Sequence, residues 1–176
     1  PAEELRAALP AAAQQVAYVG VAGTAGKTAA AALTAAVLQA AGFVTGLYRA
    51  GCEPLEQRVR INGEPVADAL LCAAAETLSR AKPLPRAAAE LAAAAACFGA
   101  AGCRLAVVEL PDAGLAEALS HMPVCVVTSI GPDGVSRSVE RSAALAAGVM
   151  REGAICVTAP EQPKAALSEL IVAAGR

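Results

Sequence analysis

The sequence predicts an α/β fold, in which a mostly parallel β-sheet forms the middle of three layers and helices cover both faces. Two observations lead to this prediction. Short runs rich in β-branched residues alternate along the chain with longer alanine-rich segments of helical length. Several of the short runs are continuously apolar, such as Ala106-Val107-Val108 and Val124-Cys125-Val126-Val127, as expected for strands buried on both faces. Parallel strands layered between helices account for both observations.

The expected elements follow one another in regular order. The strands are Val16–Val21, Phe43–Tyr48, Arg58–Ile61, Leu105–Leu110, Val124–Ile130 and Ala154–Thr158. The helices are Lys27–Ala41, Val66–Arg80, Arg86–Phe98, Leu115–Ser120, Arg141–Arg151 and Lys164–Ala174. Only Arg58–Val66 departs from the alternation, because its period-two pattern is interrupted by Asn62-Gly63, a strong hairpin signal. The break at 82–85 separates two helices, so residues 1–176 are expected to form a single domain.

The composition excludes several classes of protein. Apolar residues make up 56% of the chain and charged residues 17%, so a core can form and intrinsic disorder is excluded. The chain has 48 alanines but only two Phe, two Tyr and no Trp, so small aliphatic side chains must build this core. The net charge of -2, the lack of a basic run and the scarcity of aromatic residues argue against a nucleic-acid partner.

The uncharged stretch from Thr28 to Tyr48 is long enough to cross a bilayer. It is mostly alanine and contains Gly42, Gly46 and Gln39, so a helix followed by a buried strand explains it better, and no membrane partner is expected. No secretory signal opens the sequence. The six cysteines form no C-x-x-C pair and several lie in apolar runs, which favours buried, reduced thiols in a cytoplasmic protein.

The strongest functional signal is a glycine-rich loop between the first strand and its helix. In this setting glycines let backbone N–H groups surround a phosphate, and the start of the helix adds partial positive charge. Lys27 would reach the terminal phosphates, and the Thr28 hydroxyl would bind Mg²⁺. The full G-x-x-x-x-G-K-[ST] pattern is not met, because Val21 stands at its first position. A turn that needs glycine only for its geometry is the alternative. The candidate nucleotide-binding residues are Gly23, Thr24, Ala25, Gly26, Lys27 and Thr28.

The loop resembles the ATP-binding loop of the Mur ligase superfamily, in its G-T-x-G-K-[ST] form. Other blocks resemble, in the same order, the folylpolyglutamate synthase/dihydrofolate synthase family of that superfamily. They are V-A-G-T at 21–24, A-G-F…G-L-Y at 41–48, R-V-R-I-N-G-E-P-V at 58–66, V-V-E at 107–109, T-S-I-G-P-D at 128–133, G-V-M-R-E-G at 148–153 and V-T-A-P-E-Q-P at 157–163. The resemblance covers nearly the whole chain and implies a Mur-ligase-type ATP-binding domain, incomplete, without the C-terminal glutamate-ligase domain.

In such enzymes ATP phosphorylates the carboxylate of a folate or dihydropteroate, and the amine of glutamate then attacks the acyl phosphate. The resemblance therefore implies ATP and Mg²⁺ as cofactors, with a folate and glutamate as further ligands. It makes Lys27 the catalytic residue that serves the phosphates and makes Thr28 and Glu109 the metal ligands. A carboxylate at the carboxyl end of a parallel strand lies where such sheets bind ligands. The alternative for Glu109 is a side chain that caps a neighbouring turn.

The sequence departs from the family where the chemistry is performed. Gly134 occupies the position of a metal-binding histidine, although Asp133 of that motif is kept. Leu145-Ala146-Ala147-Gly148 has alanine where the family has a carbamylated lysine that holds a second metal, and Arg49–Cys52 replaces a folate-side S-P-H-L segment. Two hypotheses follow. The chain is part of an ATP-dependent carboxylate–amine ligase, or it is a catalytically inactive nucleotide-binding or partner module of that ancestry. An exposed sheet edge would favour pairing with a second copy or with a complementing ligase subunit.

Overall fold

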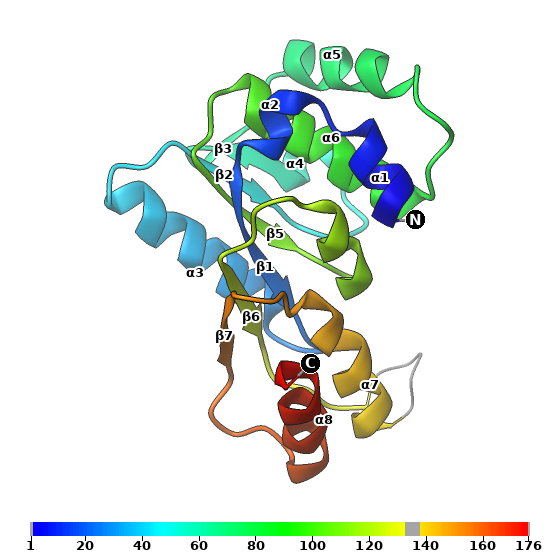
Figure 1. The fold of residues 1–176 in the computed structure, drawn as a ribbon. Coiled ribbons are helices and arrows are strands. Elements are labelled where there is room, and N and C mark those ends of the chain that lie inside the picture. The colour runs from blue at the N-terminus through cyan, green and yellow to red at the C-terminus, as the bar shows by residue number, and fades with distance from the viewer. Residues whose placement is uncertain (1, 133–137, 176) are drawn as a thin grey trace.

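A seven-stranded sheet forms the middle of the molecule in the computed structural model, which describes residues 2–132 and 138–175 (Figure 1). The strand order is β4-β3-β2-β5-β1-β6-β7. The five strands from β2 to β7 in this order pair in parallel, and β3 and β4 add an antiparallel hairpin. The strands are β1 (Ala17–Ala22), β2 (Thr45–Tyr48), β3 (Val59–Ile61), β4 (Glu64–Pro65), β5 (Leu105–Glu109), β6 (Val124–Val127) and β7 (Ile155–Thr158). The predicted mostly parallel α/β sheet is confirmed.

Helices cover the two faces of the sheet unequally. The elements are α1 (Ala2–Ala8), α2 (Ala11–Gln14), α3 (Lys27–Ala40), α4 (Leu55–Arg58), α5 (Asp68–Leu78), α6 (Arg86–Ala100), α7 (Val139–Ala146) and α8 (Lys164–Ala174), with 3-10 turns η1 (Ala113–Ala118) and η2 (Ala147–Val149). Among the described residues, α3 packs by itself on one face, against β1, β2 and β5. The larger core, on the other face, contains residues of α1, α2, α6, α7 and α8 (Figure 1).

The predicted hairpin is confirmed in detail. Asn62 has φ of 50° and Gly63 of 82°, so both central residues of the turn are left-handed, as a two-residue hairpin turn requires. Three short helices, α1, α2 and α4, were not expected, because none is long enough to show helical periodicity. The helix expected at Leu115–Ser120 is instead the 3-10 turn η1. The last expected helix but one ends early, at Ala146, and continues only as η2.

Small residues allow the helices on the larger core to approach each other closely. All eight residues from Leu91 to Phe98 of α6 are buried. A Cβ at Gly99, at the end of α6, would lie 2.5 Å from the backbone nitrogen of Ala13 in α2, so no larger residue fits there without displacing backbone. The abundance of alanine therefore produces close packing of helices in place of an aromatic core.

A buried ion pair fixes the end of β2. The Arg58 guanidinium, 1% exposed, makes two contacts with the Glu90 carboxylate, with Nη1 3.0 Å from Oε2 and Nη2 3.0 Å from Oε1. Arg58 also donates to the Glu53 carbonyl at 2.8 Å and lies over the Tyr48 ring. The Tyr48 hydroxyl donates to Glu90, and burial together with this carboxylate raises the pKa of Tyr48. Breaking such a network costs stability, because removing one charged side chain leaves the other charge in the interior without its partner.

The cysteines differ from the expectation at half of their positions. All six are free thiols, and Cys97, Cys103 and Cys125 are buried as expected. Cys52, Cys72 and Cys156 are exposed. The apolar run around Cys156 is strand β7, which lies at the edge of the sheet, so its apolar side chains are not covered. No helix in the described ranges has the length and apolar character that crossing a bilayer requires.

Candidate functional site

The glycine-rich loop lies at the carboxyl edge of the parallel strands, between β1 and α3. Gly23 has φ of 130°, and a Cβ there would lie 2.3 Å from the Thr128 hydroxyl oxygen. Gly26 has φ of 84° and lies directly before α3. Both positions adopt backbone conformations that favour glycine, and Gly23 also has no room for a side chain. The loop is thus shaped by the two glycines that the sequence marked.

The first part of the loop is bonded to the segment that follows β6. The backbone N–H groups of Thr24 and Ala25 both donate to the Ser129 carbonyl, at 3.1 and 3.2 Å. The Thr24 hydroxyl donates to the same carbonyl at 3.0 Å and accepts from the Gly131 N–H at 2.8 Å. The N–H groups of Thr24 and Ala25, which the sequence placed in the phosphate site, therefore already have an acceptor within the protein. The Thr24 side chain holds the loop against the segment that follows β6.

The amides of Gly26 to Ala29 are the ones available to a ligand. The first four N–H groups of a helix have no acceptor within it, and in α3 the first N–H to bond backward is that of Ala30, which donates to the Gly26 carbonyl at 3.0 Å. These amides lie at the positive end of the helix dipole, where anions are stabilised. The predicted phosphate loop is therefore divided into a bonded part and an open part.

Lys27, Thr28 and Glu109 lie next to this helix start. The Lys27 ammonium donates to the Gly23 carbonyl at 2.9 Å, so its side chain folds back across the loop. The Thr28 hydroxyl lies 3.2 and 3.0 Å from the two carboxylate oxygens of Glu109, at the end of β5. Glu109 is 4% exposed. The register Val21↔Glu109 brings this carboxylate beside the loop, as its position at the end of a parallel strand predicted.

The hydroxyl and carboxylate fit a hard divalent cation by their chemistry. Mg²⁺ takes oxygen ligands and is commonly bound through one or two protein oxygens together with phosphate oxygens. Thr28 and Glu109 supply such oxygens at hydrogen-bond distance from each other, beside the open amides. Within the described residues no group of three or more His, Cys, Asp and Glu side chains could hold a metal without other ligands. The residues fit a cation that is shared with a phosphate.

A cavity of about 280 Å³ adjoins the loop on the side of α7. Gly23 and Thr24 of the loop line it together with Leu145 and Ala146 of α7. Within this lining, Ala146 stands at the position where the resemblance implies a metal-binding lysine in the family. Asp112, also in the lining, accepts from the Gly114 N–H and so caps η1. Asp133 and Gly134, the other two positions of the expected metal site, lie outside the described residues.

Gln162 is a residue whose role at the loop was missed from the sequence. Its amide nitrogen donates to the Thr128 carbonyl at 2.9 Å and to the Thr158 hydroxyl at 3.0 Å, and its oxygen accepts from the Ile130 N–H at 3.0 Å. It therefore ties the end of β7 to the segment that holds Thr24. Gln162 lies in the T-A-P-E-Q-P block, and the resemblance of this block to the family does not show which contacts the Gln162 side chain makes.

A larger cavity, of about 460 Å³, lies at the amino ends of the parallel strands. Its lining includes the residues that precede β6 and β7, at the amino ends of these strands, and it is exposed around Arg6 and His121. His121 lies on the surface before a strand, as predicted. Ligands of parallel α/β sheets bind at the carboxyl ends, so the smaller cavity beside the loop is the better candidate site.

Solved structures with the same fold include several folylpolyglutamate synthetases. The Lactobacillus casei enzyme matches 99% of this chain at 26% identity with a TM-score of 0.83, over 45% of its own length. A complex with AMPPCP and folate matches 99% at 25% identity and 0.86, over 46% of its length. The Mycobacterium tuberculosis enzyme complexed with ADP matches 99% at 24% identity and 0.83, over 44% of its length. No family model and no curated protein sequence matches the chain.

Proposed function

The chain has the fold of the N-terminal domain of the folylpolyglutamate synthetases, and from this premise we propose that it binds ATP at the loop between β1 and α3. Relatives of the same fold are known with AMPPCP and with ADP. The observation that carries the proposal is the grouping of Lys27, Thr28 and Glu109 beside the open amides of the helix start. The terminal phosphates would accept from these amides and draw the Lys27 ammonium away from the Gly23 carbonyl.

Magnesium belongs to the same proposal. The Thr28 hydroxyl and the Glu109 carboxylate would hold the ion against the phosphate oxygens, where it neutralises negative charge. Within the protein, the buried Glu109 has the Thr28 hydroxyl as its hydrogen-bond donor. This contact between Thr28 and Glu109 supports a role for Glu109 as a metal ligand over the alternative, a cap of a neighbouring turn. The catalytic part of Lys27 is to stabilise charge on the transferred phosphoryl group.

Nucleotide binding at this loop is consistent with two functions, one catalytic and one not. In the ligase hypothesis the chain supplies the phosphate-binding half of an enzyme that joins glutamate to a folate-type carboxylate through an acyl phosphate. In the module hypothesis it binds nucleotide without catalysis. Ala146 favours the module, since it removes a metal ligand that the resemblance implies. The chain spans less than half the length of the solved relatives, so their whole activity and their folate and glutamate ligands are proposals here.

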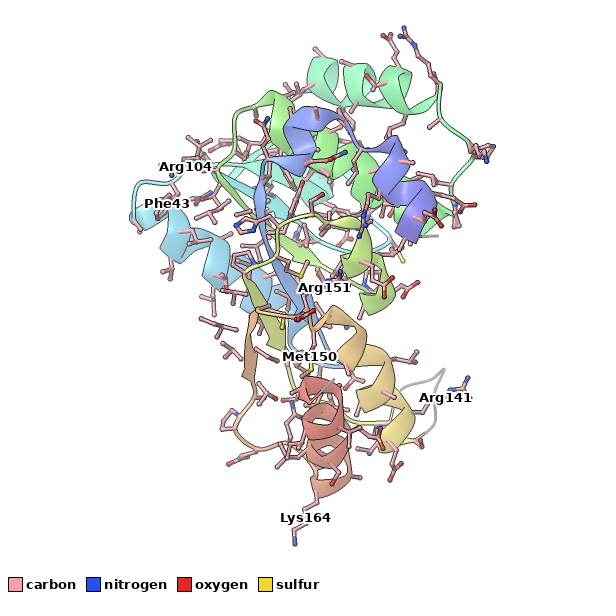
Figure 2. The ribbon with its side chains drawn as sticks, in the orientation of Figure 1. Phe43, Arg104, Arg141, Met150, Arg151 and Lys164 are labelled. Atoms are coloured by element: carbon pink, nitrogen blue, oxygen red, sulfur yellow. The ribbon has the colours of Figure 1, made fainter. Side chains whose placement is uncertain are left out.

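Calorimetric titration with AMPPCP and Mg²⁺ tests the nucleotide site. Ligand at a hundredfold excess over its Kd should stabilise the fold by about 2.7 kcal/mol, a rise in Tm of about 5–10 °C for a domain of this size. Lys27→Ala should weaken binding at least about tenfold, because an ammonium–phosphate contact is lost. Lys164→Ala is the matched control, since that side chain extends into solvent at the start of α8 (Figure 2). Coincident melting curves with and without ligand would overturn the proposal.

ADP release separates the two hypotheses. The purified chain is mixed with ATP, Mg²⁺, a folate and glutamate, and ADP is measured against a reaction without the folate. Folate-dependent ADP supports the ligase. Binding of AMPPCP with no ADP formed, at any Mg²⁺ concentration, supports the module.

The remaining expectations extend this proposal. Residues 1–176 act as one Mur-ligase-type ATP-binding domain, in keeping with the single sheet that runs through the structure. Six free thiols suit a reducing compartment, and we place the protein in the cytoplasm on that ground. The exposed edge strand β7 supports contact with a second polypeptide, either another copy or a complementing ligase subunit.

A further inference from the structure

Two of the free thiols face each other across the last pair of strands. Cys125 of β6 and Cys156 of β7 are register partners in a parallel ladder. Register partners point their side chains to the same face of a sheet, and neighbouring strands lie about 4.7–4.9 Å apart. That spacing falls inside the Cα separations of about 4.4–6.8 Å over which disulfides form. Each thiol lies near enough to the other to shift its pKa.

The two cysteines differ in their access to solvent. Cys125 is 0% exposed and belongs to the larger core. Cys156 is exposed on a strand that has a neighbour on one side only. One thiol is thus open to a reagent in solution, and the other is held directly behind it.

The interaction between the two thiols separates their acidities. Donation from the Cys125 thiol lowers the pKa of Cys156 to about 7, although partial burial acts in the opposite direction. The same hydrogen bond, with burial, raises the pKa of Cys125. The thiolate, which is the nucleophilic form, is therefore carried by the exposed member. Cys97 and Cys103 differ on both counts, since they are buried and burial raises the pKa of each to about 11.

We propose that Cys125 and Cys156 form a peroxide-reactive dithiol that closes to an intramolecular disulfide between β6 and β7. The geometry assigns the roles: Cys156 meets the oxidant, and Cys125 resolves the product. The proposal concerns a modification site at the sheet edge and does not depend on nucleotide binding.

The reaction balances with hydrogen peroxide as oxidant. The Cys156 thiolate attacks one peroxide oxygen, an S–O bond forms as the O–O bond breaks, and the leaving hydroxide takes a proton to become water. The Cys125 sulfur then attacks the Cys156 sulfenic acid, the S–S bond forms, and the S–OH bond breaks. The hydroxyl leaves as a second water with the Cys125 proton. Two thiols lose two electrons, and one peroxide gains them.

The structure also shows why the two strands could adapt to the bond. Disulfides bring Cβ atoms to about 3.8 Å, closer than register partners usually lie, so one strand must shift slightly. In the part of the chain that the structure describes, β7 pairs with β6 alone and all four of its residues are exposed, so little packing opposes its movement. An interior strand such as β5, buried and paired on both sides, would resist the same shift.

Graded oxidation of the full chain tests the proposal. The protein is treated with hydrogen peroxide at pH 7, alkylated under denaturing conditions and digested, and cross-linked peptides are identified by mass spectrometry. The expected product has an intact mass 2 Da lower, two fewer alkylated thiols and a Cys125–Cys156 link. Cys156 should be oxidised at least about fivefold faster than Cys72, an exposed thiol that serves as internal control, because the pKa of Cys156 is lowered.

Variants assign the order of events. In Cys125→Ala, Cys156 sulfenic acid should accumulate and be trapped by dimedone, and in Cys156→Ser the disulfide should not form. Cys72→Ser should behave as wild type. A link between other cysteines, dimers joined through Cys156, or oxidation of Cys156 no faster than that of Cys72 would each overturn the proposal. The wild-type peptide map decides the question even if the Cys125→Ala variant does not fold.

Discussion

The two sides of β1 are built on different principles. On one side, which we call the covered flank, β5 and β2 lie between helices, and a buried ion pair holds the end of β2. On the other side, the open flank, Cys125 and Val127 of β6 share a core with residues of α7 and α8, whereas all four residues of β7 are exposed. Of these four, Ile155 is 67% exposed and Val157 is 50% exposed. Apolar contacts are numerous on the first flank and sparse on the second.

The phosphate loop lies between these flanks and depends on both. Thr28 reaches across to Glu109 on the covered flank, whereas Thr24 and Ala25 are bonded to Ser129 on the open flank. The contacts proposed for the cation therefore rest on the better packed half. The backbone that shapes the loop rests on the half that is easier to disturb. Changes on the covered flank should act mainly on stability, and changes on the open flank mainly on binding or association.

The largest effect is expected for Glu90→Ala on the covered flank. This change leaves the Arg58 guanidinium buried with no carboxylate partner. Removing one partner of such a pair costs about 3 kcal/mol or more of unfolding free energy, measured by urea denaturation with an unchanged m-value. Glu76→Ala, on the exposed face of α5, should stay within about 0.5 kcal/mol. Equal effects of the two variants would show that the ion pair does not stabilise this flank.

The contribution of the Arg58–Glu90 ion pair to the free energy of unfolding should depend on pH. Burial acts to raise the pKa of Glu90, but hydrogen bonds from Arg58 and Arg86 outweigh it, and the pKa lies below its ordinary value of 4.5. A lowered carboxyl pKa contributes stability that is present above the unfolded pKa and is lost as pH falls through the folded one. The difference in unfolding free energy between wild type and Glu90→Gln should therefore be constant near pH 7 and shrink below about pH 4.5. A difference that grows in acid would contradict this assignment.

A smaller effect is expected for Gln162→Ala on the open flank. The variant loses two hydrogen bonds to residues 128–130 and a third to Thr158 at the end of β7. Buried partners left unpaired cost about 1–2 kcal/mol, and the loop held through Thr24 should become less ordered. Affinity for AMPPCP with Mg²⁺ should fall about three- to tenfold. Glu161→Ala, at the exposed neighbouring position, should change neither quantity. Loss of stability with unchanged affinity would show that the open flank does not shape the site.

The covered flank was the easier half to predict from sequence. Ala106-Val107-Val108 is continuously apolar because β5 is buried on both faces, and Asn62-Gly63 indicated the hairpin because few other residues adopt its left-handed turn. The loop was recognised for a similar reason, since Gly23 and Gly26 both have positive φ. In each case the local backbone or its burial restricts which residue types can occur, so the feature can be predicted from the sequence.

The open flank was harder to predict from sequence, because a strand at the edge of a sheet is exposed when no further strand or helix covers it. Ile155-Cys156-Val157 has the same apolar pattern as a buried strand, so the exposure of Cys156 was missed. The contacts of Gln162 and the pairing of Arg58 with Glu90, which is 32 residues away, join segments distant in sequence. No local pattern reports such contacts, and they are known only once the topology is known.

The smallest effect on stability is expected for Ile155→Lys. The side chain is largely exposed, so the unfolding free energy should change by no more than about 0.5 kcal/mol. Association should change more, because an uncovered edge strand with apolar side chains can pair with a second copy, and a lysine on the edge opposes that pairing. Light scattering after size-exclusion chromatography should show a wild-type mass that rises with concentration and an Ile155→Lys mass that stays at 17.4 kDa plus the change in side chain.

A matched variant separates the position of the charge from the charge itself. Ala75→Lys adds the same charge on the exposed surface of α5, which lies far from β7 (Figure 1), and it should associate as wild type does. If both lysine variants are monomeric, net charge and not the edge strand controls association. If the wild type is itself monomeric at every concentration, the open flank does not bind a second copy, and only a different polypeptide could cover it.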